Sequence, residues 1–316
     1  MEIKKQELFI QLPSLQFFAA GDNNDQPVRI YQKQFVELMT AVFRKQAYFG
    51  RFFTGGLQAL DGVANNATAF TVKTSDIPVV VGTYDTDPNV AFGTGTANTT
   101  RFGERTEVIY VDTDVKYTWD WAFHEGIDRH TVNNNFEAAI ADRLDLQAQA
   151  KINQFNRHHG KFISDNAGKT EALTAYTNDE VLALFNRLAA YYINIEAVGN
   201  KVAVVTPALY NAIVDHPLMT TGKNSRTNID DNEVFRFKGF EIQEMPDALA
   251  QTGEIAYVYI EGIAKAFTGI NTTRTIESED FDGVALQGAG KAGEFIPNDN
   301  KKAVVKVTGP AVTPEG

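Results

Sequence analysis

The amino-acid sequence predicts an α+β fold, in which helices and strands occupy separate stretches of the chain. Three observations support this prediction. Residues 115–121 alternate strictly between apolar and polar side chains, which indicates a strand with one buried face. Residues 134–158 carry apolar side chains at every fourth position, which is typical of a long helix. Residues 177–215 combine two helical patterns with a short, entirely apolar strand.

The composition excludes several kinds of chemistry. The chain has 316 residues and is 43% hydrophobic, which is enough for one large or two modest domains. It contains no cysteine, so disulfides, thiolate metal sites and cysteine nucleophiles are excluded. A formal net charge of −11 argues against a DNA-wrapping or DNA-reading role, because Lys and Arg dominate phosphate binding. No long apolar run predicts a transmembrane helix, and residues 1–7 lack the continuous apolar core of a signal peptide.

The N-terminal residues predict an extended arm followed by a short helix. Residues 1–30 scatter large apolar side chains among polar ones, so we expect this arm to pack on a surface such as a neighbouring subunit. From Gln32 to Phe49 the apolar side chains fall at three- and four-residue spacing, which predicts a helix that Gly50 ends. The apolar positions of this helix are Phe35, Leu38, Met39, Val42, Phe43 and Ala47.

Residues 51–106 are rich in glycine and threonine and predict a long β-hairpin with a glycine-rich tip. Short alternating runs such as Ile77-x-Val79-x-Val81 supply its strands. A projecting hairpin needs a surface to lie on, and another copy of the chain is one such surface. Residues 107–121 then predict one long strand. Its second half places Val115, Tyr117, Trp119 and Trp121 on one face.

The longest predicted helix runs from Asn134 to His158, with Asn133 or Asn134 as its cap and Gly160 as its end. About 25 residues at ~1.5 Å each give a rod of roughly 37 Å. The apolar row along this helix comprises Phe136, Ile140, Leu144, Ala148, Ile152 and Phe155. The other face carries Asp142, Arg143, Asp145, Gln147, Gln149 and Lys151, so one side is predicted to be polar.

Residues 177–215 predict a compact α/β unit. The capping box Thr177-Asn178-Asp179-Glu180 opens a helix. The core-facing side chains of that helix are Val181, Leu184, Phe185, Leu188 and Tyr192. Residues 202–205 form the buried strand, and Thr206-Pro207 starts a second helix that runs through Asp215.

The remainder of the chain predicts a loop and a series of strands. Residues 217–232 are the loop, and short strands follow at residues 235–245 and 255–261. Residues 264–308 are predicted as strands, with turns at Gly283 and at residues 297–300 and a last strand at 304–307.

Two glycine motifs lack the context that phosphate binding requires. Residues 288–293 match the dinucleotide fingerprint G-x-G-x-x-G, but strand and turn residues follow where a helix N-terminus should bind the pyrophosphate. Gly168-Lys169-Thr170 resembles the end of a P-loop, but Ile163 stands where the first glycine should be. We therefore predict no cofactor.

Metal and catalytic motifs are also incomplete. His124-Glu125 begins like a zinc-protease motif, but the next histidine, His130, comes six residues later instead of four. Asp85-x-Asp87-x-Asn89 begins like a calcium loop but lacks the later glycine and glutamate. We therefore predict no metal site and no catalytic residue, which favours a protein that is not an enzyme.

Three stretches, taken with the order of the predicted elements, resemble one protein family. Residues 108–128, which lead into the helix 134–158, look like that family's junction of strand and spine helix. Val202-Ala203-Val204-Val205-Thr206-Pro207-Ala208-Leu209-Tyr210-Asn211-Ala212-Ile213 is similar to its A-domain strand, Ser/Thr-Pro cap and helix. Phe237-Lys238-Gly239-Phe240-Glu241-Ile242 is similar to the strand that follows its A-domain loop. The chain thus resembles the major capsid proteins of tailed bacteriophages, which have the Hong Kong 97-like fold.

The resemblance implies a division of the chain into five parts. These are an N-arm with a short helix at 1–49, an extended E-loop hairpin at 50–115 and a P-domain strand with the spine helix at 116–176. An A-domain at 177–262 and returning strands of the A- and P-domains at 263–316 complete the chain.

The resemblance also implies a function and partners. The chain would self-assemble as hexamers and pentamers into an icosahedral shell around the double-stranded DNA genome of a tailed phage. Its partners would be other copies of itself, a portal, a scaffolding protein that we expect to be separate, and packaged DNA held without sequence-specific contacts. It would need no cofactor and no membrane, and would belong to the virion capsid after assembly in the bacterial host cytoplasm.

The predicted subunit contacts are Arg101, Phe102, Glu104 and Arg105, because charges alternate there in a glycine-rich setting near the base of the predicted hairpin. Three alternatives stay open. The same fold serves encapsulins, which are cellular nanocompartments that package enzymes. A soluble α/β enzyme with an unrecognised acidic site would be monomeric. A phage tail or adhesin component would form rings or tubes.

Overall fold

The computed structural model describes residues 46–59, 68–74, 79, 81–86, 101–103, 107–132, 136–217 and 236–310. The predicted arm, nearly all of the predicted helix at 32–49, the hairpin tip and most of the loop at 217–232 lie outside these ranges. Residues 46–49 are not helical, and Gly50 begins the 3-10 turn η1 (Gly50–Phe52) instead of ending a helix. Over the described ranges, no helix combines the length and apolarity needed to cross a membrane.

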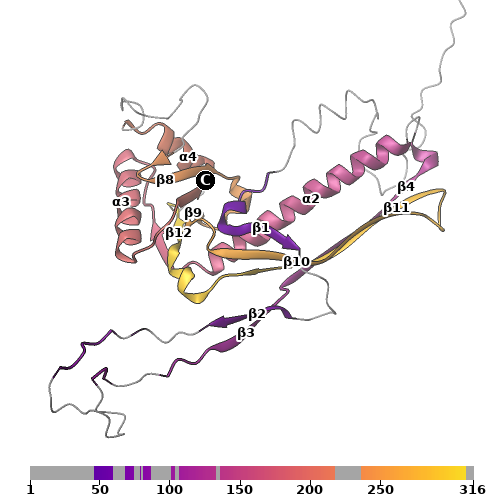
Figure 1. The fold of residues 1–316 in the computed structure, drawn as a ribbon. Helices are drawn as coiled ribbons and strands as arrows, with labels where there is room; N and C mark the ends of the chain where they lie inside the picture. The colour runs from indigo at the N-terminus through magenta and orange to yellow at the C-terminus, as the bar shows by residue number, and fades with distance from the viewer. Residues whose placement is uncertain are drawn as a thin grey trace, which may run out of the picture.

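The molecule is elongated and has three parts (Figure 1). One part is a six-stranded sheet with two helices packed on it. The second is a long helix that lies along a long β-hairpin. The third is a two-stranded arm that projects from the base of that hairpin.

The six-stranded sheet has the strand order β5-β12-β9-β6-β8-β7. Its strands are β5 (Lys169–Ala172), β12 (Val304–Thr308), β9 (Glu254–Ile260), β6 (Lys201–Val205), β8 (Phe240–Glu244) and β7 (Arg236–Phe237). One face packs against α3 (Asn178–Asn194) and α4 (Pro207–Val214) in one hydrophobic cluster. The other face packs against residues 49–53 and the C-terminal end of the long helix, around Tyr257 and Tyr259. Burial on both faces explains why β6 is apolar throughout.

The predicted α/β unit is confirmed in its main elements. The five core-facing side chains predicted for α3 are all at most 1% exposed. The apolar strand and the helix that starts at Pro207 are also present. Thr177 and Thr206 occupy the two N-cap positions, but neither side chain makes a capping hydrogen bond, so the predicted capping box is wrong in that detail.

The four-stranded sheet has the order β1-β10-β11-β4. Its strands are β1 (Phe53–Ala59), β10 (Ala264–Glu277), β11 (Gly283–Phe295) and β4 (Trp119–Asp128). Strands β10 and β11 form the long antiparallel hairpin, and β1 joins β10 in parallel. The glycine motif 288–293 lies inside β11, as the prediction of a strand required. A side chain at Gly288 would lie 2.2 Å from the ring of Phe123, so glycine lets that ring lie against the strand.

The long helix α2 (Phe136–Asp165) extends past Gly160, so the prediction that this glycine ends the helix is wrong. The reason is packing. A Cβ atom at this position would lie 2.7 Å from the carbonyl oxygen of Leu249 and 3.3 Å from the ring of Phe49. Glycine therefore permits a close approach of neighbouring elements here and does not terminate the helix.

The predicted single strand 107–121 is two strands, β3 (Val111–Lys116) and β4, interrupted at Tyr117-Thr118. The interruption lets β3 pair with β2 (Thr68–Thr74) while β4 pairs with β11. The predicted alternation is confirmed, because Val115 and Trp121 are buried while the side chains between them are exposed or half-buried. The predicted hairpin at 51–106 is partly wrong. Its first segment, β1, belongs to the four-stranded sheet, and β2 takes its partner from 111–116.

Short 3-10 turns connect several of these elements. They are η2 (Arg129–Thr131), η3 (Asp247–Leu249) and η4 (Asn298–Ala303). The division of the chain into the five named parts stays a prediction.

Candidate functional site

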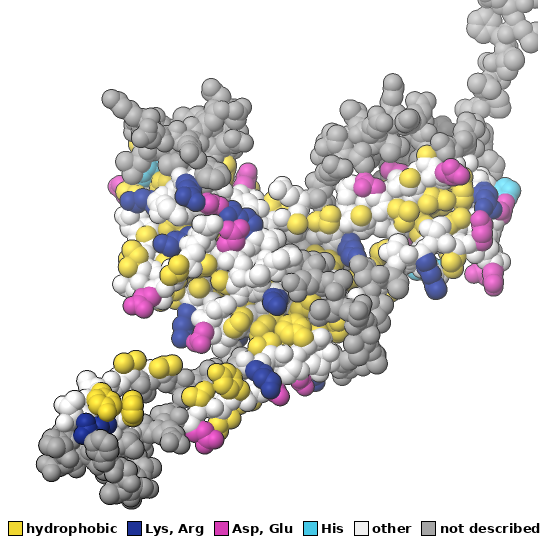
Figure 2. Space-filling model, viewed as in Figure 1, with side chains coloured by type: hydrophobic (Ala, Val, Ile, Leu, Met, Phe, Trp, Pro, Cys, Tyr) yellow, Lys and Arg dark blue, Asp and Glu magenta, His cyan; other side chains and the backbone are white. Residues whose placement is uncertain are grey.

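Exposed apolar side chains gather between residues 79 and 111, in the part of the chain that continues from β2 and includes the start of β3. We call these exposed apolar side chains the arm surface. In Figure 2 hydrophobic side chains are visible along this projecting arm. The members are Val79 (90% exposed), Val81 (89%), Tyr84 (55%), Phe102 (84%), Val108 (52%), Ile109 (58%), Tyr110 (65%) and Val111 (59%). Most of the large exposed hydrophobic side chains in the described part of the chain belong to this set. A concentration of exposed apolar side chains is typical of interaction surfaces.

Two of the predicted contact residues, Arg101 and Phe102, lie on this arm, but not at its base. The backbone N–H of Asp85 donates to the carbonyl oxygen of Arg101 at 2.9 Å, and the rings of Tyr84 and Phe102 meet edge to face at 5.1 Å. Both pairs lie beyond the distal end of the β2–β3 ladder, which finishes at Thr74 opposite Val111. The predicted position near the hairpin base is therefore wrong for Arg101 and Phe102. Glu104 and Arg105 lie outside the described residues.

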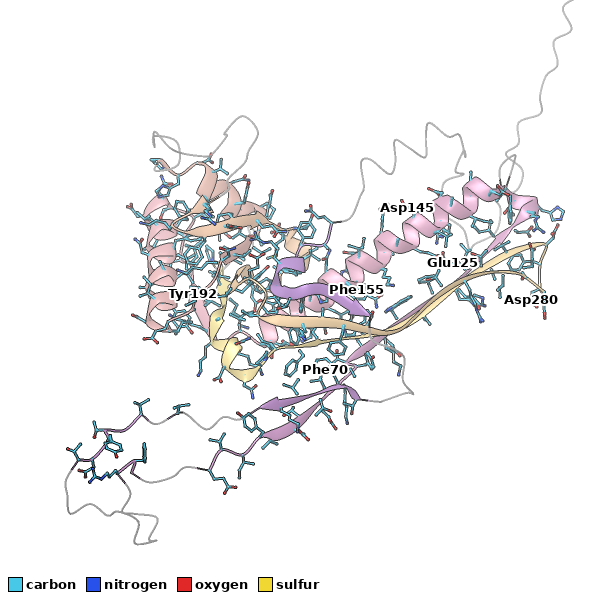
Figure 3. All side chains as sticks on the ribbon, in the orientation of Figure 1. Phe70, Glu125, Asp145, Phe155, Tyr192 and Asp280 are labelled. Carbon is cyan, nitrogen blue, oxygen red and sulfur yellow. The ribbon has the colours of Figure 1, made fainter. Side chains whose placement is uncertain are left out.

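Aromatic rings attach the base of the arm to the long hairpin. The ring of Phe70 from β2 lies 5.1 Å from that of Phe267 and 5.9 Å from that of Phe295 (Figure 3). Tyr117, at the interruption between β3 and β4, also packs on Phe267 at 5.6 Å. The base is thus fixed to the body of the molecule, while the distal part projects with its apolar side chains exposed.

A buried carboxylate joins three elements just above that base. The side chain of Glu294, from β11, is 4% exposed. It accepts hydrogen bonds from Trp119 Nε1 at 3.1 Å and from Thr118 Oγ1 at 3.3 Å. The Nδ1 atom of His159, from α2, lies 3.0 Å away, and because a carboxylate can only accept, this nitrogen carries the hydrogen. Glu294 therefore links the arm base, the sheet and α2.

The indole of Trp119 lies between helix and strand at the same junction. It stacks on the imidazole of His158 with ring centroids 4.0 Å apart and an interplanar angle of 4°. The ring of Phe155 meets it edge to face at 4.7 Å. Burial lowers the pKa of the His158 imidazole, and the nearby Glu294 carboxylate opposes that shift in part. His158 is thus held against Trp119 by ring contact.

Polar side chains also fill the space between the N-terminal half of α2 and the sheet. Glu125 of β4 accepts hydrogen bonds from Arg143, through Nε at 2.8 Å, and from Gln147. The hydrogen bond with Arg143 lowers the pKa of the Glu125 carboxyl. Further along, Lys151 Nζ lies 3.9 Å from the centre of the Trp121 ring. Three residues of the side predicted to be polar, Arg143, Gln147 and Lys151, therefore face the sheet, together with Phe155 of the predicted apolar row.

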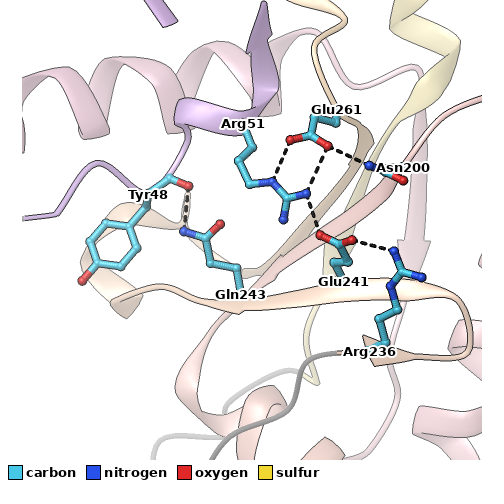
Figure 4. A network of polar contacts seen from close by, with 7 residues as sticks. All are labelled: Tyr48, Arg51, Asn200, Arg236, Glu241, Gln243 and Glu261. Atoms are coloured by element: carbon cyan, nitrogen blue, oxygen red, sulfur yellow. Dashed lines mark hydrogen bonds and ion pairs between the residues drawn. The ribbon is translucent and has the colours of Figure 1, made fainter. Parts of the chain in front are cut away.

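A second polar network ties the N-terminal segment to the six-stranded sheet (Figure 4). Arg51 donates to Glu261 at 2.9 Å and pairs with Glu241 at 2.6 Å. Glu241 also pairs with Arg236 at 2.7 Å, and Gln243 donates to the carbonyl oxygen of Tyr48 at 3.1 Å. The hydrogen bonds from Arg236 and Arg51 lower the pKa of the Glu241 carboxyl. These contacts hold the chain in place where it enters the described structure.

The histidines play structural parts in the described ranges. His124 contacts the Gln287 amide at 3.2 Å, His130 pairs with Asp282 at 3.3 Å, and His216 contacts the carbonyl oxygen of Asn178 at 3.1 Å. Within the described residues, no three His, Asp or Glu side chains gather as they would around a metal ion.

Comparison with known proteins identifies the fold. By sequence, no family model and no curated protein matches the chain. By structure, it is similar to the capsid of cyanophage P-SCSP1u, at a TM-score of 0.63 and 11% identity, over 85% of this chain and 89% of that one. The mature capsid of bacteriophage PhiM1 gives the same values. The capsid of a native GTA particle matches at a TM-score of 0.52 and 12% identity, over 96% of this chain and all of that one (100%). The predicted capsid fold is therefore confirmed: this chain folds as phage capsid subunits do.

Proposed function

We propose that this chain is a major capsid protein that self-assembles as hexamers and pentamers into an icosahedral shell around the double-stranded DNA of a tailed phage. The observation that carries the proposal is the arm surface. A subunit of capsid fold projects apolar side chains that its own described core does not cover. A neighbouring subunit that covers them would give each copy a directional contact, as closed shells require.

The energetics favour association through this arm. Val79, Val81 and Phe102 are each more than four-fifths exposed. Full burial of such a side chain contributes about 1.5–3 kcal/mol. Association costs roughly 4–15 kcal/mol in lost translational and rotational freedom, so several arm side chains are needed to offset it. In a closed ring every subunit both gives and receives an arm, and the contacts add around the ring.

The implied partners follow from the same role. Other copies of the chain are the principal partner, with a separate scaffolding protein and a portal during assembly. A net charge of −11 suits a shell that encloses DNA without gripping it through sequence-specific contacts. The protein would then belong to the virion capsid, assembled in the cytoplasm of the bacterial host, and would act as a structural protein without catalytic residues.

Arm variants test this proposal. Val81→Ser combined with Phe102→Ser should abolish particles in negative-stain images while the subunit still unfolds cooperatively. Val198→Ser is the matched control, because this valine is 93% exposed on a different part of the molecule. Arg101→Glu with Arg105→Glu should likewise block assembly. Normal particles from the apolar double variant would contradict the proposal, and normal particles from the charge-reversed one would remove the two arginines from it.

The contents of native particles separate a phage shell from the alternative nanocompartment. Particles from producing cells should contain double-stranded DNA protected from nuclease. Particles that contain a cargo enzyme and no DNA would assign the chain to the encapsulin type instead.

A further inference from the structure

Residues 107–110 are exposed and lead directly into β3. Val108, Ile109 and Tyr110 are each more than half exposed. The ladder between β2 and β3 stops at Val111, and the backbone of residues 107–110 makes no hydrogen bond with any other residue that the structure describes. Its N–H and C=O groups are therefore available to pair with another strand.

Strand β3 is open along its outer edge as well. In the described part of the chain, β2 and β3 form a sheet of two strands, so β3 has a neighbour on one side only. The first four residues of β3, from Val111 to Asp114, are all exposed. A ribbon of two strands is at best marginally stable in water, and a third strand stabilises it. Residues 107–114 thus offer one continuous free edge where the arm needs a further strand.

The sequence of this edge suits strand pairing. Residues 108–111 are Val, Ile, Tyr and Val, the β-branched and aromatic types that favour strands. Glu107 and Asp112 flank this apolar run. Charges beside an exposed apolar strand protect it against indiscriminate pairing before the correct partner is met. The edge is therefore built to pair selectively.

Charge decides what kind of partner fits. Residues 107–114 contain Glu107, Asp112 and Asp114 and no Lys or Arg. Asp112 contacts Lys73 of β2 at 3.7 Å, which leaves the other two acids without a base on this edge in the described ion pairs. Pairing with the same segment of another copy would gather acids on both strands, and like charges opposite one another are destabilising. A neutral or basic segment fits better, so the contact joins two different surfaces, as ring closure requires.

We propose that residues 107–114 add as a strand to a different segment of a second copy of this chain. Main-chain hydrogen bonds would then join neighbouring subunits, in addition to the apolar side chains of the arm surface. Strand addition draws affinity from the backbone and specificity from alternate side chains, so it fixes the register between subunits. Such a contact rests on the proposed shell function, which requires only that the arm be covered, and it specifies how the arm is held.

Amide hydrogen exchange of the full chain, followed by mass spectrometry, tests this contact. In unassembled subunits the amides of residues 107–110 should exchange as fast as those of an unstructured peptide, because they have no partner among the described residues. In assembled particles their exchange should be at least about tenfold slower. The amides of α3 are the internal control and should exchange slowly in both states, since this helix is packed in the six-stranded unit.

Proline variants distinguish backbone pairing from side-chain docking. Ile109→Pro and Tyr110→Pro each remove one N–H group, and successive N–H groups of a strand point to opposite edges. One of the two variants should need a protein concentration at least about tenfold higher to form particles than its alanine control, Ile109→Ala or Tyr110→Ala. The other should match its control. Both should unfold cooperatively in urea, because this segment has no ladder within the subunit.

The outcomes separate this contact from the shell function. Fast exchange of residues 107–110 in particles that form normally would overturn the strand addition and leave the shell function standing. An equal effect of the two prolines, relative to their alanine controls, would also overturn it, because side-chain docking does not discriminate between successive N–H groups. A chain that forms no particles would overturn both.

Discussion

The buried Glu294 should be the most sensitive single position at the junction of arm, sheet and long helix. Replacement by leucine removes the acceptor for Trp119 Nε1 and the partner of His159 Nδ1. Each donor left unsatisfied in a buried site costs about 1–3 kcal/mol. The added leucine recovers part of that cost by apolar burial, about 1–2 kcal/mol. We expect Glu294→Leu to lower the free energy of unfolding by about 3 kcal/mol, within the usual range for breaking a buried pair.

Urea unfolding of the unassembled subunit, followed by tryptophan fluorescence, measures this effect well. The two tryptophans of the chain, Trp119 and Trp121, lie on β4 beside the junction, so their emission reports its integrity. Glu294→Gln keeps an acceptor oxygen and should cost about 1 kcal/mol. Glu277→Leu, at a carboxylate that is 70% exposed, should cost less than about 1 kcal/mol. If Glu294→Leu unfolds like the exposed control, the reasoning about the junction is refuted.

Three further predictions concern stability. Gly160→Ala should lower the free energy of unfolding by about 1–3 kcal/mol, because overpacking at a 2.7 Å contact outweighs the gain in helix propensity. Gly82→Ala, with open space around the glycine, should not lower the free energy of unfolding. Equal stability of the two variants in urea would contradict this prediction. Burial lowers the pKa of His158, so the unfolded chain binds its proton more readily, and stability should fall as pH drops below about 6.5. His158→Phe keeps a ring against Trp119 and should flatten the stability profile between pH 7.5 and 5.5; an unchanged slope would remove this histidine as its source. Arg51→Gln should lower the free energy of unfolding by about 1 kcal/mol, a small amount because the side chain is 37% exposed. It should also speed limited proteolysis near the N-terminus. Digestion at the rate of the natural protein would show that the network around Arg51 does not fix this segment.

Local patterns predicted those elements whose apolar side chains all lie on one face and meet one core. The helix α3 buries the side chains that its periodicity indicated, and Pro207 starts α4 as expected. These elements pack within one compact sheet-and-helix unit, so amphipathic pattern and burial agree.

The long helix shows where local patterns fail. The strand β4, which precedes α2 in the chain, presents the polar Glu125 together with Trp121 to this helix, so Arg143 and Lys151 face the sheet. A periodicity of four identifies an apolar row, but not which surface that row meets. The predicted end of α2 at Gly160 was wrong for a different reason, because this glycine makes room for Phe49 and Leu249, which are far away in sequence.

The sequence predicted that a projecting segment would carry the candidate site, but not which residues of that segment would be exposed. The glycine- and threonine-rich composition indicated a projecting hairpin that needs a partner, and the arm surface agrees with that expectation. The apolar members Val79 and Val81 were visible in the alternating run of the sequence, yet the proposed contacts were placed by charge alternation. Exposure, which decides which side chains are available to a partner, depends on tertiary structure and could not be predicted from composition.

The most direct test of the central claim is the assembly state of the purified chain, measured by light scattering together with negative-stain microscopy. Closed shells, or hexamers and pentamers, are expected to form as the concentration rises. A stable monomer at high concentration, with no shell even under crowding, would contradict the claim that this chain is a shell-forming subunit.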